Sequence, residues 1–241
     1  MNAITSCLTA IWTSSIGKKL IVAITGAFLV LFLAGHLVGN LVVFMGAEPF
    51  NAYAYFLHHM LHGAGIWLFR LVMIAALGLH IAATVALTLQ NRAARKQYEC
   101  KSTIQATLSS RVMIVSGLTI LVFFIYHMLH FTVRAGAAAG YDTAERYQNF
   151  KLPGVEHGVH NAWLMVIDGF SVWYVSAFYI LGMLLLCSHL SHGVQSIFQT
   201  LGLRSKKATA LLKLLSVAYS VFIFAGFVSI PIAILVFGFG R

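Results

Sequence analysis

Six histidines lie within long apolar stretches of this 241-residue chain, where a polar side chain is costly. They are His36, His80, His127, His130, His189 and His192. A lone histidine at such a depth often hydrogen-bonds a neighbouring helix. Histidines on four successive apolar segments instead indicate a shared task, and imidazole is a ligand for iron, copper, zinc and nickel.

The choice among these metals follows from the number of ligands. A zinc site usually has four close ligands, often with cysteine, whereas Cys7, Cys100 and Cys187 are far apart in the sequence. A haem needs two axial ligands, and its iron accepts histidine readily. Small residues beside the histidines would let a flat macrocycle approach the backbone, although they also serve helix packing. They are Gly35, Gly39, Gly78, Ala82, Gly182 and Gly193.

Transmembrane helices must position these histidines. The chain is 60% hydrophobic and 9% charged, whereas soluble domains are about 45–50% apolar and about 25% charged. This composition disfavours a soluble globule, a disordered chain and a nucleic-acid-binding domain. We expect one all-α domain over residues 1–241, a bundle of five transmembrane helices, because five runs can each cross about 30 Å of hydrocarbon. The runs are Leu20–Met45, Gly63–Leu89, Val112–Val133, Val166–Phe198 and Leu211–Phe239.

The distribution of charge predicts the orientation of these helices. Of sixteen Lys and Arg residues, ten lie at the N-terminus, between the second and third runs, or between the fourth and fifth, and an eleventh, Lys213, lies at the start of the fifth run. Glu99 is the only acidic residue in these flanks. The positive-inside rule therefore predicts a cytoplasmic N-terminus and an outside C-terminus in the inner (cytoplasmic) membrane. Arg70 also falls within a predicted span, near its outer end.

Helix direction sorts four histidines by depth. His36 and His127 lie about 25 and 24 Å from the inner ends of their runs, in the outer half. His80 and His189 lie about 26 and 32 Å from the outer ends of theirs, in the inner half. Two bis-histidine haems stacked across a membrane would need this arrangement. His130 and His192 each follow a candidate ligand by three residues, so they could be alternative ligands, could bind a haem propionate, or could simply snorkel to an interface.

Several stretches around these histidines resemble one family. They are LAGHLVGN at Leu33–Asn40, GAEPFNAYAYF from Gly46, LGLHIAATVAL around His80, SGLTILVFFIYH ending at His127, and FYILGMLLLCSHLSHG through Gly193. The chain resembles the membrane-anchoring cytochrome b subunit of succinate dehydrogenase and fumarate reductase (succinate:quinone oxidoreductase, respiratory complex II), in its single-chain, five-helix, two-haem form. The resemblance covers nearly the whole chain, and no single motif in it is specific.

The resemblance implies which residues bind which haem. His36 and His127 would hold the iron of the distal haem b, and His80 and His189 that of the proximal haem b. The chain would pass electrons between an iron–sulfur subunit at the cytoplasmic face and quinone in the bilayer, with menaquinone the implied quinone. FAD and the iron–sulfur clusters would belong to the flavoprotein and iron–sulfur subunits, so this chain alone should not oxidise succinate. The complex could form a higher oligomer, and it would contact membrane lipid but no nucleic acid.

Further polar residues are candidates for a quinone or proton site and for partners of the haem propionates. The first set lies near the outer end of the second run, where a surface cluster without a ligand is the alternative: Glu48, His58, His59, His62 and Arg70. The second set is chosen from charge and depth: Arg111, Tyr126, Arg134 and Lys207. Loop bases of this kind also serve simply to set topology.

Two other functions are compatible with intramembrane histidines. The haem b subunit of a hydrogenase or formate dehydrogenase also uses histidines on a helical core, in a different ligand order. A proton-coupled transporter could use histidines as a relay, but such transporters often show inverted repeats and broken helices, and the sequence shows neither.

Overall fold

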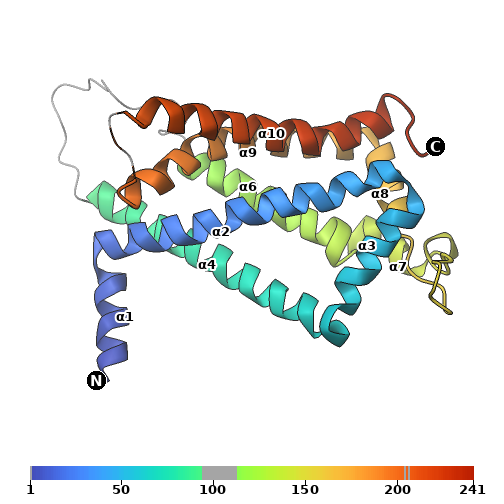
Figure 1. Cartoon of the computed structure of the whole chain (residues 1–241), viewed down its shortest axis with the longest axis horizontal. Helices are drawn as coiled ribbons and strands as arrows, with labels where there is room; N and C mark the ends of the chain where they lie inside the picture. Colours follow the sequence, from blue (N-terminus) through green and yellow to red (C-terminus); the bar gives the residue numbers. More distant parts are fainter. Residues whose placement is uncertain (1, 94–112, 204, 206) are drawn as a thin grey trace. The chain divides into compact units, whose positions relative to one another are not determined.

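The computed structural model of the chain is all-α, and five of its helices are long and apolar enough to cross a membrane (Figure 1). The structure describes residues 2–93, 113–203, 205 and 207–241. By helix length and hydropathy the chain is a multi-pass membrane protein. The long helices are α2 (Ser15–Leu41), α4 (Ala64–Ala93), α6 (Met113–His127), α9 (Trp173–Thr200) and α10 (Thr209–Leu235).

The fourth apolar run is not one helix, as the sequence suggested, but two. Helix α8 (Ala162–Ser171) is followed by Val172, whose backbone is extended with φ −85° and ψ 113°. Helix α9 then begins at Trp173. The buried Ser176 hydroxyl donates to the Phe170 carbonyl at 2.6 Å, across the break. This hydrogen bond satisfies a carbonyl that the interrupted helix leaves unpaired.

Shorter helices fill segments that the sequence marked as connections. Helix α3 (Ala47–His59) follows the 3₁₀ turn Val42–Met45, and a second 3₁₀ turn at Met60–Gly63 leads into α4. After α6, a π-helical turn (Met128–Thr132) leads to two 3₁₀ turns, Gly136–Ala139 and Glu145–Tyr147, and to α7 (Gly140–Thr143) between them. A short amphipathic or interfacial segment was expected within Ala135–Met165, whereas α3 was not predicted.

The contacts group the described residues into two units. Unit 1 comprises those within Met1–Phe32, Leu71–Gly117 and Ser188–Ser220. Unit 2 comprises those within Leu33–Arg70, Leu118–Cys187 and Val221–Arg241. Each of the five long helices contributes one part to each unit.

A tight corner in unit 1 joins α2 to a short N-terminal helix, α1 (Ala3–Thr13), which Figure 1 shows leaving α2 at a steep angle. A Cβ on Gly17 would lie 2.0 Å from the Ile11 carbonyl oxygen, so the corner requires glycine there. Lys18 is only 3% exposed, and its Nζ donates to the Thr13 carbonyl at 3.1 Å. A cation at the C-terminal end of α1 is favourable because the helix dipole is negative there.

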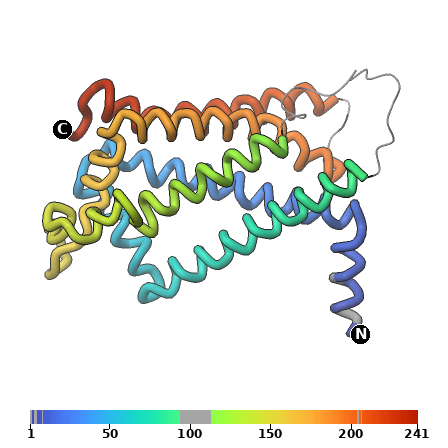
Figure 2. Tube along the Cα trace, turned by 180° about the vertical axis from the view of Figure 1, so that it is seen from behind, coloured from blue at the N-terminus to red at the C-terminus, as the bar shows by residue number. Residues whose placement is uncertain are grey.

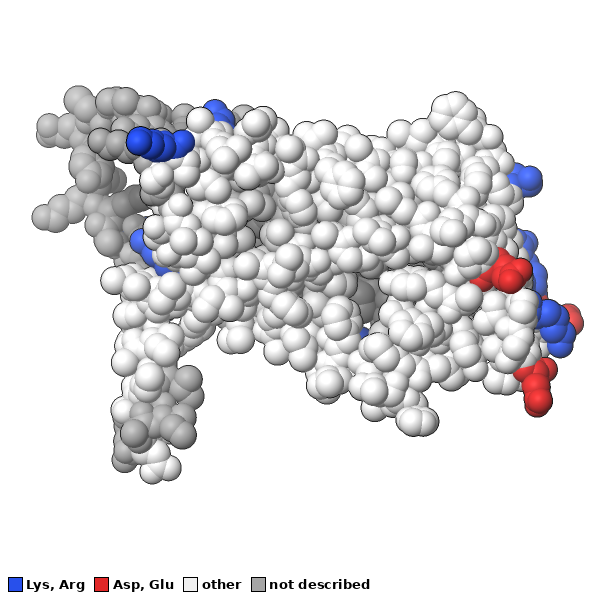
Figure 3. Space-filling view, in the orientation of Figure 1, with Lys and Arg blue, Asp and Glu red and all other residues white. Residues whose placement is uncertain are grey.

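Charged residues divide unevenly between the units. All five described acidic residues belong to unit 2, and Figure 3 shows acidic and basic side chains gathered together at one end of this unit. Unit 1 has five described basic residues and, within the part of it that the structure describes, no acidic one. Unit 1 therefore carries the more positive charge.

In unit 2, α3 packs against α8 beside the core residues Val43, Phe50 and Ile167 (Figure 2). Asn51 is 1% exposed, and its amide nitrogen donates to Asn161 Oδ1 at 2.9 Å. The side-chain oxygen of Asn51, Oδ1, accepts from the Trp163 backbone nitrogen at 3.0 Å. These bonds join α3 to the first turn of α8, where backbone N–H groups have no partner within the helix.

We expect Asn51→Ala to destabilise the protein by about 1–3 kcal/mol, because the Trp163 N–H loses its buried acceptor. Thermal unfolding in detergent would measure the change. Asn91→Ala is the matched control, since Asn91 is exposed near the end of α4. Equal unfolding midpoints for the two variants would show that the Asn51 bonds do not stabilise the fold.

Candidate functional site

His80 in unit 1 faces a hydroxyl group on α2. Its Nδ1 lies 3.1 Å from Thr25 Oγ1, and the Thr25 hydroxyl donates its proton to the Ile21 carbonyl at 2.6 Å. Since that hydroxyl has only one proton, it can only accept from the imidazole. The network therefore assigns the proton of His80 to Nδ1 and leaves a lone pair on Nε2, as a metal-binding imidazole requires.

His189, also in unit 1, has the same arrangement on another helix. Its Nδ1 lies 3.2 Å from Ser116 Oγ of α6, and the Ser116 hydroxyl donates to the Met113 carbonyl at 3.1 Å. The proton of His189 is therefore also assigned to Nδ1.

A glycine follows each of these hydroxyl residues and makes room for the imidazole. A Cβ on Gly26 would lie 3.3 Å from His80 Cε1, and a Cβ on Gly117 would lie 3.6 Å from His189 Cε1. The rings thus rest close to the backbones of α2 and α6. These hydroxyl–glycine pairs were not predicted, although the two share a sequence pattern. Each pair begins eleven residues before a histidine of the same helix, His36 or His127.

Unit 2 brings together the other two predicted ligands, His36 and His127. Their ring centroids are 5.9 Å apart and their planes make an angle of 80°. Two imidazoles on opposite sides of one metal ion, with metal–nitrogen bonds of about 2.0–2.1 Å, have centroids about 6 Å apart. The observed distance is similar to this spacing, and the two predicted ligands are close neighbours within unit 2.

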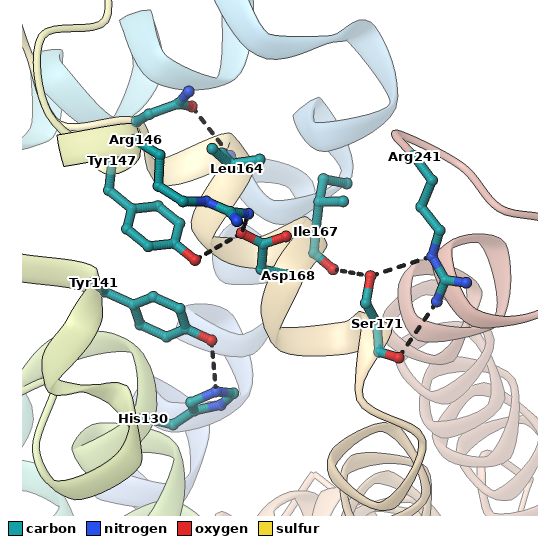
Figure 4. A network of polar contacts seen from close by, with 10 residues as sticks. His130, Tyr141, Arg146, Tyr147, Leu164, Ile167, Asp168, Ser171 and Arg241 are labelled. Carbon is teal, nitrogen blue, oxygen red and sulfur yellow. Dashed lines mark hydrogen bonds and ion pairs between the residues drawn. The ribbon is translucent and has the colours of Figure 1, made fainter. Parts of the chain in front are cut away.

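A chain of hydrogen bonds runs from His127 through two tyrosines (Figure 4 shows its last link). The Tyr179 hydroxyl lies 3.3 Å from His127 Nδ1 and 3.1 Å from His130 Nδ1, and the Tyr141 hydroxyl lies 3.4 Å from His130 Nε2. Both ring nitrogens of His130 thus have protein partners. This arrangement favours a structural role for His130 and leaves His127 as the ligand candidate.

The remaining candidates for propionate partners or alternative ligands lie in separate places. Tyr126 packs against Phe178 with ring centroids 4.8 Å apart, and Lys207 is exposed. His192 lies on α9 in unit 1, where its carbonyl accepts from Ser196. Arg111 lies outside the described residues.

Two of the glycines expected to make room for a macrocycle instead receive side chains of the protein. A Cβ on Gly39 would lie 2.3 Å from the Tyr53 hydroxyl oxygen, and one on Gly182 would lie 2.4 Å from Phe123 Cδ2. These two glycines serve packing within unit 2. Around Gly35, Gly78 and Gly193, no described atom lies within 4 Å of a built Cβ.

Three of the five quinone-site candidates line one cavity of unit 2, of about 420 Å³. These are His58, His59 and Arg70, whereas Glu48 and His62 are not among its lining residues. Residues from more distant segments complete its polar wall: Arg134, His157 and His160. No local pattern in the sequence predicts this convergence, because it arises from the packing of α3 against α8.

Comparison with known proteins yields no assignment: no family model matches the chain, and no curated protein or solved structure is detectably similar to it.

We expect Tyr179→Phe to destabilise the protein by about 1–3 kcal/mol, because His130, which is 8% exposed, loses a buried hydrogen-bond partner. Tyr126→Phe is the control, because it removes a hydroxyl from a neighbouring ring outside the hydrogen-bonded chain. Thermal unfolding of both variants in detergent would measure the difference. If both unfold at the wild-type temperature, the shared hydroxyl is not a structural link.

Proposed function

We propose that this chain is a two-haem cytochrome b that anchors a succinate:quinone or quinol:fumarate oxidoreductase in the membrane. The observation that carries the proposal is the presence of one histidine pair in each unit, on four different helices. His36 of α2 and His127 of α6 would hold one haem b. His80 of α4 and His189 of α9 would hold the other.

The donor set fits haem better than a bare metal ion. In the described part of the chain, no three His, Cys, Asp or Glu side chains gather where they could hold a metal ion. A porphyrin supplies four ligands of its own and needs only two more from the protein. When bound, haem iron supplies reversible one-electron transfer at a potential that its protein surroundings tune.

The protein's part in this function is to orient the imidazoles and to exclude water. Thr25 and Ser116 hold the Nδ1 protons of His80 and His189, which fixes each ring with Nε2 directed away from its anchor. Tyr179 makes the corresponding contact to His127. His36 has no equivalent hydroxyl anchor among these contacts: the Asn40 amide nitrogen donates to the His36 backbone carbonyl at 2.7 Å and lies 3.3 and 3.4 Å from the two ring nitrogens. Such partners of a ligand commonly influence metal affinity strongly.

The partners and setting follow from the resemblance. The chain would work with a flavoprotein subunit and an iron–sulfur subunit at the cytoplasmic face and would exchange electrons with quinone, menaquinone by preference. The positive charge of unit 1 supports a cytoplasmic location for that unit. Reconstitution with the succinate or fumarate subunits would separate this assignment from the hydrogenase and formate dehydrogenase alternative.

The histidine assignment predicts haem content. We expect His36→Ala, His80→Ala, His127→Ala and His189→Ala each to lose one of two haems, because each removes one axial ligand. His192→Ala and His130→Ala should keep both. Haem per protein in the purified variants, measured by pyridine haemochrome absorbance, is the readout. Full retention of both haems by His127→Ala would transfer the ligand role to His130.

The hydroxyl anchors make a second prediction. Ser116→Ala should weaken the affinity of one haem by about 10- to 100-fold, because His189 loses the partner that holds its ring and tautomer. Transfer of haem to apomyoglobin would measure the change. Ser216→Ala is the matched control. Ser216 is fully buried, and its hydroxyl, like that of Ser116, donates to a carbonyl of its own helix, here that of Leu212. Equal transfer rates from the two variants would exclude an anchoring role for Ser116.

A further inference from the structure

The polar cavity of unit 2 lies where four segments of that unit meet. His58 comes from α3, Arg70 from the first turns of α4, and Arg134 from the turn that follows the π-helical segment. His157 and His160 come from the loop before α8. No aspartate or glutamate is among the described residues that line it. Its polar wall therefore consists mainly of hydrogen-bond donors and basic groups.

Arg134 is incompletely satisfied at this wall. One of its terminal nitrogens, Nη1, lies 2.9 Å from Asp142 and 3.1 Å from His160 Nε2. Its Nε is buried and has no hydrogen-bond partner among the described residues. A buried N–H donor without an acceptor is rare in folded proteins, so the described residues do not fully satisfy the Arg134 side chain.

The backbone also holds Arg134 in an unusual conformation. Its φ is +54°, in the left-handed region that residues other than glycine seldom adopt. Non-glycine residues in this region concentrate at functional sites and ligand clamps.

Arg70 contributes a positive charge to the cavity, and no described carboxylate forms an ion pair with it. Its guanidinium lies 4.9 Å from the centre of the Trp67 ring, and no described carboxylate lies within 4.0 Å of it. Burial, together with the neighbouring Arg134, lowers the pKa of His160, so this imidazole is neutral and accepts from Arg134. Since Asp142 balances Arg134, the cavity has about one positive charge in excess.

We propose that this cavity binds a phosphate group. Guanidinium groups match phosphate oxygens with paired N–H donors, and the donors here approach from several segments, as a tetrahedral anion requires. A neutral quinone would leave the charge of Arg70 without a counterion. The volume of about 420 Å³ exceeds that of a phosphate ion alone and accommodates a larger headgroup.

Two sources can supply this chemistry: the headgroup of an anionic phospholipid or free inorganic phosphate. The surroundings favour the lipid, because Trp67 is 62% exposed and is followed by the exposed Leu68. Tryptophan is enriched where a membrane protein meets the lipid headgroups. Acyl chains would then lie along this apolar surface.

The test uses the full chain in detergent and follows its unfolding midpoint as ligand is added, because a ligand of the folded state raises it. The probes are dihexanoyl phosphatidylglycerol and inorganic phosphate, with chloride at equal ionic strength as the screening control. We expect phosphatidylglycerol to stabilise the wild-type protein saturably and Arg70→Gln to raise the half-saturating concentration at least tenfold. Saturation by inorganic phosphate as well would identify the bare anion as sufficient.

Arg92→Gln is the matched control, because Arg92 lies on the same helix but in unit 1, and it should bind like the wild type. Arg134→Gln should weaken binding as Arg70→Gln does, and Arg70→Gln keeps the test valid if loss of the Asp142 pair prevents folding. Equal binding by Arg70→Gln and wild type would overturn the proposal. So would stabilisation by a short-chain menaquinone analogue that Arg70→Gln abolishes while neither phosphate probe binds. Haem content is independent of these outcomes.

Discussion

An imidazole in the hydrocarbon region of a membrane must find a partner for each ring nitrogen, because no water is there to supply one. This constraint shapes the helices around the buried histidines. Thr25 and Ser116 each give their own proton to a carbonyl of the preceding turn and so present only an acceptor to His80 and His189. The result is one defined tautomer, with the other nitrogen left for a metal.

The same two helices carry both an anchor and a ligand candidate. In α2 the segment is TGAFLVLFLAGH and in α6 it is SGLTILVFFIYH, each with a hydroxyl residue, a glycine and, at the end, a histidine. Eleven residues make about three turns of α-helix, so hydroxyl and histidine lie on the same face. Inserting or deleting one residue between them would rotate one against the other by about 100°. The spacing therefore ties the two histidine pairs to a common helical register.

Much of the arrangement could be predicted from the sequence because hydropathy and helix length depend on local composition alone. The five long helices and five of the six histidines belong to this part, whereas His130 lies in the π-helical turn after α6. The break at Val172 could not be predicted, because it lies inside the continuous apolar run Val166–Phe198. Within α8, Asp168 binds Arg146 and accepts from the Tyr147 hydroxyl at 2.6 Å (Figure 4). Burial and this hydrogen bond raise the pKa of Tyr147, so it remains a donor at neutral pH.

The hydrogen-bond partners of the histidines likewise could not be predicted from the sequence. Thr25 and Ser116 look like ordinary small polar residues until the fold sets them opposite His80 and His189. The phosphate cavity is a further example, since Arg134 and His160 become neighbours only when the loop before α8 folds back. Spacing along one helix was informative, whereas the choice of neighbouring helix required the structure.

The most direct measurement of the central claim is low-temperature electron paramagnetic resonance of the purified wild-type chain, expressed with ample haem supply and combined with haem quantification. The account predicts two haems b per chain, both low-spin with two imidazole ligands, and two separate steps in a redox titration. A colourless protein, or a single high-spin haem, would contradict it.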